Sequence, residues 1–196
     1  MIYYDDHIWD LNLHQALAEV CEQRREYALR YCQERDQRLC LAAYILLWRA
    51  LRLEYGIDEA PEFIYGNHGK PFLKGHPEIH FSLSHCPVAV ACAVSDHPVG
   101  IDIETTAHYS IEVARRVMND DEILQIEASA QPEVTFTRLW TMKESLYKLT
   151  SDDTGGDIRH MLDNDNVVLP VSFETIVFPH GICTLCRSMG EYENTK

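Results

Sequence analysis

Two acidic segments of this chain carry the residue types that bind metal ions and phosphates. The segments are Val99-Gly-Ile-Asp-Ile-Glu104 and Leu139-Trp-Thr-Met-Lys-Glu-Ser-Leu-Tyr-Lys148. If the first is a strand, side-chain alternation places Asp102 and Glu104 on one face, about 7 Å apart by the strand rise. If the second is a helix, Glu144 and Lys148 lie one turn apart on one stripe. Together they offer hard oxygen ligands for Mg²⁺ and a cation for phosphoryl charge.

Each of these features also has an ordinary structural explanation. Acidic residues are common on the solvent face of an edge strand. A Glu and a Lys four residues apart in a helix usually form a surface ion pair that stabilises the helix by about 0.2–0.5 kcal/mol. We interpret Trp140 as a core anchor, because its indole ring buries a large area. The residue pattern alone therefore leaves a purely structural role open for the three acids.

The same residues resemble a known family. Gly100 to Glu104 followed by Trp140 to Lys148 resembles the two-part signature of the 4′-phosphopantetheinyl transferases, which attach the coenzyme A arm to carrier proteins. Upstream, His68-Gly-Lys-Pro71 and Phe81-Ser-Leu-Ser-His85 resemble coenzyme-binding segments of that family. The segments keep their order and span most of the chain. The length of 196 residues is similar to that of the larger, single-chain, surfactin-synthetase-activating type.

The resemblance implies an α+β fold made of two similar halves in a pseudo-twofold arrangement, with the active site in the cleft between them. The N-terminal half, 1–97, is expected to supply the coenzyme A contacts. The C-terminal half, 98–196, is expected to hold the metal site, the catalytic helix and the carrier-docking surface, the last around 111–126. The connector Asp96-His-Pro98 marks the boundary.

The resemblance also implies roles for individual residues. Asp102, Glu104 and Glu144 are expected to hold Mg²⁺ against the pyrophosphate of coenzyme A. Glu144, directly or through a water on the metal, would take the proton from a carrier serine, and Lys148 would offset charge on the leaving 3′,5′-ADP. The positions matched to coenzyme contacts are Arg38, His68, Lys70, Pro71, Ser84, His85 and Lys143.

The carrier itself is not specified by the sequence. An apo acyl or peptidyl carrier protein of fatty acid, polyketide or nonribosomal peptide synthesis is compatible with the resemblance, which also implies a monomer.

Two departures from the family pattern keep alternatives open. Gln23 and Glu26 stand where related enzymes often have lysines, and Lys148 is followed by 149–153 without the usual early glycines. A noncatalytic carrier- or nucleotide-binding module of the same fold, and a plain α+β interaction protein, are the rival readings.

Composition narrows the class of partner and compartment. The net charge of −14 argues against a general nucleic-acid binder, which needs a basic surface. The seven cysteines are odd in number and show no disulfide framework, so reduced thiols in the cytoplasm are expected. Cys183-Thr-Leu-Cys186 has a redox- or metal-like spacing but lacks a second such pair. The apolar run 39–48 is too short to cross a bilayer.

Periodicity and breaker residues predict the elements. Gly56 is expected to end a helix, and Asn119 with Glu122 to form a capping box. The predicted helices are 13–31, 37–55, 111–118, 120–129 and 133–149. The predicted strands are 63–65, 79–83, 88–94, 99–104, 167–178 and 182–187.

Overall fold

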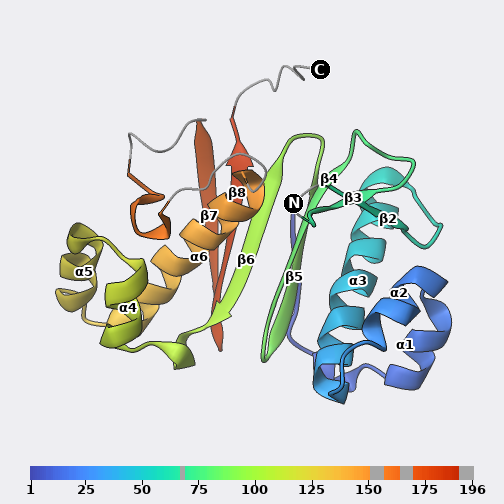
Figure 1. The fold of residues 1–196 in the computed structure, drawn as a ribbon, viewed down its shortest axis with the longest axis horizontal. Coiled ribbons are helices and arrows are strands. Elements are labelled where there is room, and N and C mark those ends of the chain that lie inside the picture. The colour runs from blue at the N-terminus through green and yellow to red at the C-terminus, as the bar shows by residue number, and fades with distance from the viewer. Residues whose placement is uncertain (67–68, 151–156, 164–169, 190–196) are drawn as a thin grey trace. The chain divides into compact units, whose positions relative to one another are not determined.

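A computed structural model describes residues 1–66, 69–150, 157–163 and 170–189. The chain divides into two compact units, Met1–Asp96 and His97–Lys196. Figure 1 gives the order of the elements along the chain, from blue at the N-terminus to red at the C-terminus. Both units combine helices with antiparallel sheet, which confirms the α+β class predicted from the sequence.

The first unit is built on a three-stranded antiparallel sheet with the order β1-β5-β4. Its strands are β1 (Ile2–Asp5), β4 (His80–Cys86) and β5 (Ala89–Ser95), and a separate hairpin is formed by β2 (Phe63–Tyr65) and β3 (Pro71–Leu73). Strand β1 was not predicted from the sequence. Its four residues are too few to show alternation, and pairing with the buried strand β5 defines it as a strand.

The helices of the first unit are η1 (Ile8–Asp10), α1 (Leu13–Glu19), α2 (Glu22–Ala28) and α3 (Glu34–Tyr55). The long helix α3 packs its apolar face against the sheet and ends at Gly56, which has φ +68°, as predicted. The single predicted helix 13–31 was wrong, because the chain is extended at Val20 and Cys21. The guanidinium of Arg25 donates to the carbonyl of Leu17 at 2.6 Å and so caps the end of α1.

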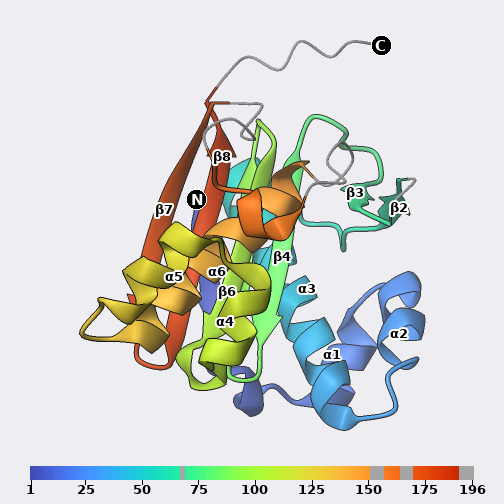
Figure 2. The same ribbon diagram turned by 60° about the vertical axis from the view of Figure 1, so that its left-hand side comes forward.

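The second unit has a three-stranded antiparallel sheet with the order β6-β8-β7. Its elements are β6 (Val99–Thr105), η2 (Thr106–His108), α4 (Ile111–Val117), α5 (Asp120–Glu127), α6 (Pro132–Thr150), η3 (Ile158–His160), β7 (Val171–Phe178) and β8 (Gly181–Ser188). The long helix α6 lies along one face of this sheet, and α4 and α5 pack on its outer side (Figure 2). The capping box of Asn119 and Glu122 is present at the start of α5.

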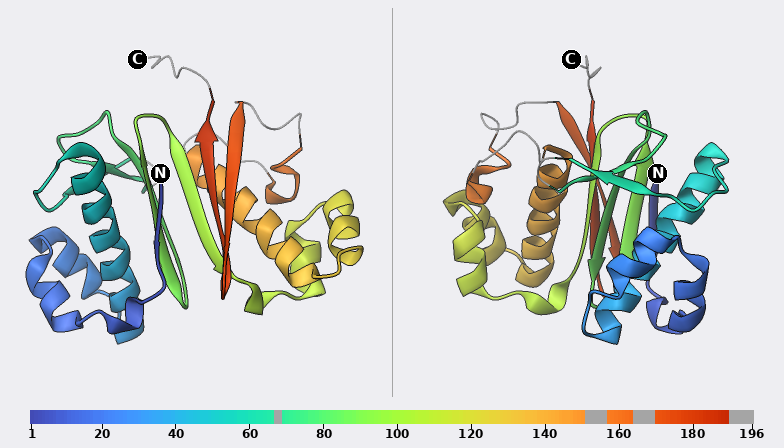
Figure 3. Two further views of the ribbon diagram at one scale, coloured as in Figure 1. Left: turned by 180° about the vertical axis from the view of Figure 1, so that it is seen from behind. Right: turned by 45° about the vertical axis from the view of Figure 1, so that its right-hand side comes forward.

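The two units share one connectivity. In each, a first strand is followed by helices that end in one long helix, and then by a hairpin whose last strand takes the centre of the sheet. The long helices are α3 in the first unit and α6 in the second, and both can be followed in Figure 3. The first unit differs in the small β2–β3 hairpin that comes between its long helix and its last two strands.

Gly100 allows α6 to pack directly on β6. A Cβ atom at this position would lie 1.9 Å from the carbonyl oxygen of Ser145 and 2.7 Å from the backbone nitrogen of Leu149. Only a residue without a side chain tolerates so close an approach of helix and strand. Because Gly100 lies two residues before Asp102, the contact brings the acidic segment of α6 beside the acidic end of β6.

We therefore expect Gly100→Ala to destabilise the protein by about 2–3 kcal/mol, since the backbone of α6 must move away from β6. The measurement is urea unfolding followed by circular dichroism. Val177→Ala, at an exposed position of the same sheet, is the control and should cost less than about 1 kcal/mol. Equal losses for the two variants would show that the close approach at Gly100 is not required.

Candidate active site

The two acidic segments meet within the second unit. Asp102 and Glu104 alternate onto the face of β6 that α6 covers, and Glu144 and Lys148 lie one turn apart on α6. The ammonium of Lys148 lies 2.7 Å from Oδ1 of Asp102, whose side chain is only 5% exposed. This ion pair brings Asp102 of the strand and Lys148 of the helix together.

Three threonines hold α6 in register with the sheet beside this site. The hydroxyl of Thr141 on α6 lies 2.7 Å from that of Thr184 on β8, which lies 3.1 Å from that of Thr175 on β7. Thr184 is also the cross-strand partner of Asp102, so the two share one face of the sheet. Thr141 and Thr184 are fully buried, and their hydroxyls satisfy one another. The sequence analysis missed this row, because isolated threonines carry no distinctive pattern.

The pKa values of the two glutamates at the site are raised. The pKa of Glu104 is raised to about 7, mainly by burial, then by the charge of Asp102 and more weakly by that of Glu144, while Lys148 partly offsets the shift. Burial and the charge of Asp102 also raise the pKa of Glu144. The site therefore holds more negative charge than its single lysine balances, and an added cation would be favourable.

The donor set fits Mg²⁺ in its chemistry. Mg²⁺ binds carboxylate oxygens, keeps several waters, and often uses only one or two carboxylates together with a substrate phosphate. The oxygens of Asp102, Glu104 and Glu144 do not all lie within 4.8 Å of one another, and Lys148 holds Asp102. Among the described residues, the only His, Cys, Asp and Glu side chains grouped that tightly are the surface cluster 5–7 in the first unit.

The raised pKa of Glu104 leads to a prediction about pH. Its folded-state value of about 7 lies above the ordinary value of 4.5, so between these values the folded state binds an extra proton. The stabilisation that this extra proton gives the folded state is fully present below pH 4.5 and is lost as the pH rises through about 7. We expect Glu104→Gln to gain about 1–3 kcal/mol over the wild type between pH 5 and pH 8.

The measurement is urea unfolding of both proteins in metal-free buffer at several pH values across that range. A difference between wild type and Glu104→Gln that stays constant with pH would contradict the predicted protonation. Added Mg²⁺ should stabilise the wild type at pH 8 and stabilise Glu104→Gln less, because the variant has lost one anionic ligand.

Arg38, one of the predicted coenzyme residues, is engaged within its own unit. Its guanidinium donates to the carbonyl of Leu11 and lies 2.6 Å from the carboxylate of Glu34. Lys70 and Pro71 lie at the start of β3 and are partly exposed.

The remaining coenzyme candidates of the first unit differ in accessibility. Ser84 is buried and His85 is exposed, and as neighbours on β4 their side chains leave opposite faces of the strand. His68 lies outside the described residues. The side chains of Ser84 and His85 therefore cannot both reach one phosphate group from this strand. If both residues donate to it, one of them must do so through its backbone N–H, or the strand must change its conformation.

The entry helix α2 uses its polar residues for packing. The side-chain amide of Gln23 exchanges two 2.9 Å hydrogen bonds with the backbone of Phe63, which ties α2 to β2. The guanidinium carbon of Arg24 lies 4.8 Å from the ring centre of Tyr44 and 5.1 Å from that of Phe63. Gln23 and Arg24 therefore have structural roles in α2. This is the helix in which Gln23 and Glu26 stand where related enzymes often have lysines.

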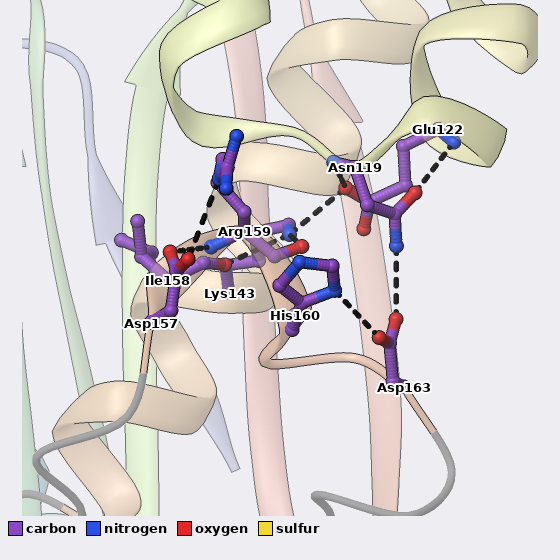
Figure 4. A network of polar contacts seen from close by, with 8 residues as sticks. All are labelled: Asn119, Glu122, Lys143, Asp157, Ile158, Arg159, His160 and Asp163. Carbon is purple, nitrogen blue, oxygen red and sulfur yellow. Dashed lines mark hydrogen bonds and ion pairs between the residues drawn. The ribbon is translucent and has the colours of Figure 1, made fainter.

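Lys143 does not behave as the sequence predicted. Its side chain is 0% exposed, and its ammonium lies 2.9 Å from Oε2 of Glu122 on α5. It also donates to the carbonyls of Ile158 at 2.9 Å and Arg159 at 2.6 Å (Figure 4). With three partners and no solvent-facing surface, Lys143 has no free donor for a coenzyme phosphate, so a coenzyme contact is not supported. Sequence reasoning treated Glu122 only as a helix cap.

The cysteines show no disulfide. All seven are free thiols. Cys183 and Cys186 are buried in β8 and, being three residues apart, point to opposite faces of the strand, so they cannot form one metal or redox centre. Within the described residues, no helix combines the length and apolar character that a membrane span requires.

Comparison with known proteins agrees with this site. A family model described as the 4′-phosphopantetheinyl transferase superfamily matches residues 98–184, which include all four site residues. The chain is 31% identical over 150 residues to the 4′-phosphopantetheinyl transferase Sfp of Bacillus subtilis (strain 168), covering 75% of this chain and 67% of that protein. It is 33% identical over 134 residues to the 4′-phosphopantetheinyl transferase gsp of Aneurinibacillus migulanus, covering 67% of this chain and 56% of that protein.

The chain therefore belongs to the 4′-phosphopantetheinyl transferase superfamily. Its similarity to Sfp and gsp confirms the predicted surfactin-synthetase-activating type. A further Bacillus subtilis relative, named 4′-phosphopantetheinyl transferase, is 33% identical over 135 residues, and the match covers 60% of its length. The chain thus spans between about half and two thirds of these relatives.

Proposed function

We propose that this protein transfers the 4′-phosphopantetheine group of coenzyme A to a serine of an apo carrier protein and releases 3′,5′-ADP, in a reaction that depends on Mg²⁺. The observation that carries the proposal is the meeting of Asp102 and Glu104 on β6 with Glu144 and Lys148 on α6. This pairing falls inside the segment that matches the transferase family.

The three carboxylates would hold Mg²⁺ beside the pyrophosphate of coenzyme A. When bound, Mg²⁺ neutralises phosphate charge and withdraws electron density from the reacting phosphorus. Glu144 accepts the proton of the carrier serine, and its raised pKa makes it a stronger base than an ordinary glutamate. The serine oxygen bonds to the β-phosphorus as the bond to 3′,5′-ADP breaks, and Lys148 balances the charge that leaves.

The proposal takes its coenzyme contacts from the first unit. Those residues are Arg38, His68, Lys70, Pro71, Ser84 and His85, with Lys143 left out. The similarity of the two halves belongs to the same proposal. The shared connectivity of the two units supports it.

The carrier is proposed to dock on α4 and α5. Leu124 on α5 is 64% exposed, and Val113 on α4 is also exposed. Arg115 and Arg116 lie on the same segment, but Arg115 pairs with Glu127 at 3.5 Å, so the exposed apolar side chains and not charge support this surface. We further propose that the protein is a monomer, that it acts in the cytoplasm, and that it has no nucleic-acid partner.

A panel of apo acyl and peptidyl carriers tests it. Each carrier is incubated with the protein, coenzyme A and Mg²⁺, and its intact mass is followed. We expect at least one carrier to gain one phosphopantetheine group, and the same carrier with its acceptor serine changed to alanine to gain none. Binding of coenzyme A by calorimetry without any mass gain would favour the noncatalytic module instead.

Lys148→Ala separates binding from turnover. We expect turnover to fall by about 10²-fold, because one cation aimed at the leaving group is lost. The affinity for coenzyme A should change less, since other residues hold the coenzyme. Steady-state kinetics with calorimetry measures both quantities. A large loss of affinity with unchanged turnover would make Lys148 a binding residue only.

A further inference from the structure

Lys143 is the centre of a buried polar network that the proposed mechanism does not use. Its ammonium, on α6, contacts the carboxylate of Glu122, on α5, at 2.9 Å. It also contacts the carbonyl oxygens of Ile158 and Arg159 at 2.9 and 2.6 Å. In Figure 4 these groups converge from two helices and from the short helix η3. One lysine therefore ties three separate pieces of the second unit together.

The network extends from Glu122 to the start of α5, where Asn119 holds the segment 157–163 at a second point, Asp163. Glu122 and Asn119 exchange two 2.8 Å hydrogen bonds in the capping box of α5. The side-chain amide of Asn119 donates to Asp163 at 2.8 Å, and Asp163 also lies 2.8 Å from His160. The segment that follows the helix α6 in the sequence is thus fixed through Lys143 at one end and through Asp163 at the other.

Stability alone is a weak explanation for this arrangement. Removing a lysine and a glutamate from water is costly, and replacing a buried ion pair by apolar residues of similar size is often neutral or stabilising. Lys143 has 0% and Glu122 9% side-chain exposure, so the cost applies to both. What an apolar pair could not do is donate to the two carbonyls and so fix the segment to α6.

The position of Lys143 in α6 gives the network a consequence for the active site. Lys143 and Glu144 are neighbours in the helix, so their side chains leave it about 100° apart. Fixing the direction of Lys143 therefore fixes the direction of Glu144. The threonine row at Thr141 and Thr184 holds the register of α6, and the network adds a constraint on its rotation.

We propose that Lys143 and Glu122 are positioning residues that set the rotation of α6 and thereby place Glu144 beside Asp102. This inference rests on the proposed function, which gives Glu144 its role. Neither Lys143 nor Glu122 touches the reacting groups. Their effect is expected in metal binding and turnover and not in the affinity for coenzyme A.

The test compares Lys143→Met/Glu122→Gln with the wild type. Methionine keeps the unbranched chain of lysine, and glutamine can keep the capping bond, so both charges are removed together. We expect kcat to fall by about 10-fold or more, because small misplacements of catalytic groups are costly. KM for coenzyme A should stay within about 3-fold, since the coenzyme contacts are untouched.

Two further readouts do not need catalysis. Binding of Mn²⁺ alone should weaken severalfold in the double variant, because Glu144 is displaced. Amide hydrogen exchange in 157–163 should become faster, because the carbonyls of Ile158 and Arg159 lose their donor. Phe136→Leu is the control, a core change in α6 two turns from Glu144 that lowers stability without altering charge. It should leave kcat and Mn²⁺ binding close to those of the wild type.

The outcomes are distinct. If kcat and Mn²⁺ binding of the double variant equal those of Phe136→Leu, the network is structural only and the inference is overturned. A raised KM with unchanged kcat would mean that Lys143 reaches the coenzyme. If the wild type itself transfers nothing, the proposed function fails, while Mn²⁺ binding and hydrogen exchange still decide the positioning role. Should the double variant not fold, Glu122→Asp keeps both charges, and its kcat should still fall at constant KM; full kcat would overturn the inference.

Discussion

Asp102→Ala is expected to lower phosphopantetheine transfer by about 10³-fold or more, even at saturating Mg²⁺. The aspartate is buried beneath α6, pairs with Lys148 at 2.7 Å, and raises the pKa of both Glu104 and Glu144. It thus contacts the lysine and influences both glutamates of the site. Losing a metal ligand and the partner of Lys148 together removes several kcal/mol of transition-state stabilisation, and each 1.36 kcal/mol is tenfold in rate.

Asp102→Asn sharpens this prediction, because asparagine keeps the shape of the side chain and removes only the charge. We expect the wild type to gain about 2.7 kcal/mol in thermal unfolding at a Mg²⁺ concentration of 100 times Kd, and we expect both variants to fold and to lose this stabilisation. The matched control is Glu112→Gln on α4, which neutralises an exposed acid of the same unit. Activity retained by Asp102→Ala at saturating Mg²⁺ would remove Asp102 from the ligand set.

Glu144→Gln is the second change with a large expected effect. Because glutamine cannot accept the serine proton, kcat should fall by about 10²–10⁴-fold. KM for coenzyme A should change little. The pKa of Glu144 is raised by burial and by Asp102, so the wild-type kcat should decline with falling pH, as the base becomes protonated, at a higher pH than for an ordinary glutamate. The residual activity of the glutamine variant should lack this decline.

Steady-state kinetics across the pH range measures this effect, with Glu144→Asp as the companion variant. Aspartate keeps the carboxylate one methylene farther from the substrate, so the pH-dependent decline should persist at a lower rate. A glutamine variant that keeps both wild-type kcat and its pH dependence would show that another group takes the proton.

Much of the site could be predicted from local patterns. Alternation correctly placed Asp102 and Glu104 on one face of a strand, and the helical period placed Glu144 and Lys148 on one stripe. The end of α3 at Gly56 and the capping box of α5 were also predicted, because each depends on a few neighbouring residues.

The features that escaped prediction depend on distant parts of the chain. The break between α1 and α2 is stabilised by Arg25 reaching back to Leu17, and β1 is a strand because β5 pairs with it. Lys143 was misread because lysine is almost never fully buried unless paired. Its partner Glu122 lies on another helix, and no local pattern reports that contact.

The measurement that tests the central claim most directly is the intact mass of an apo carrier protein after incubation with this protein and coenzyme A, with Mg²⁺ and with a chelator. We predict one added phosphopantetheine group with Mg²⁺, none with the chelator, and addition that is slower by about 10³-fold or more with Asp102→Ala in the presence of Mg²⁺. Equal mass gain with and without the metal ion would contradict the assignment of Asp102, Glu104 and Glu144, and no gain with any carrier would contradict the transferase itself.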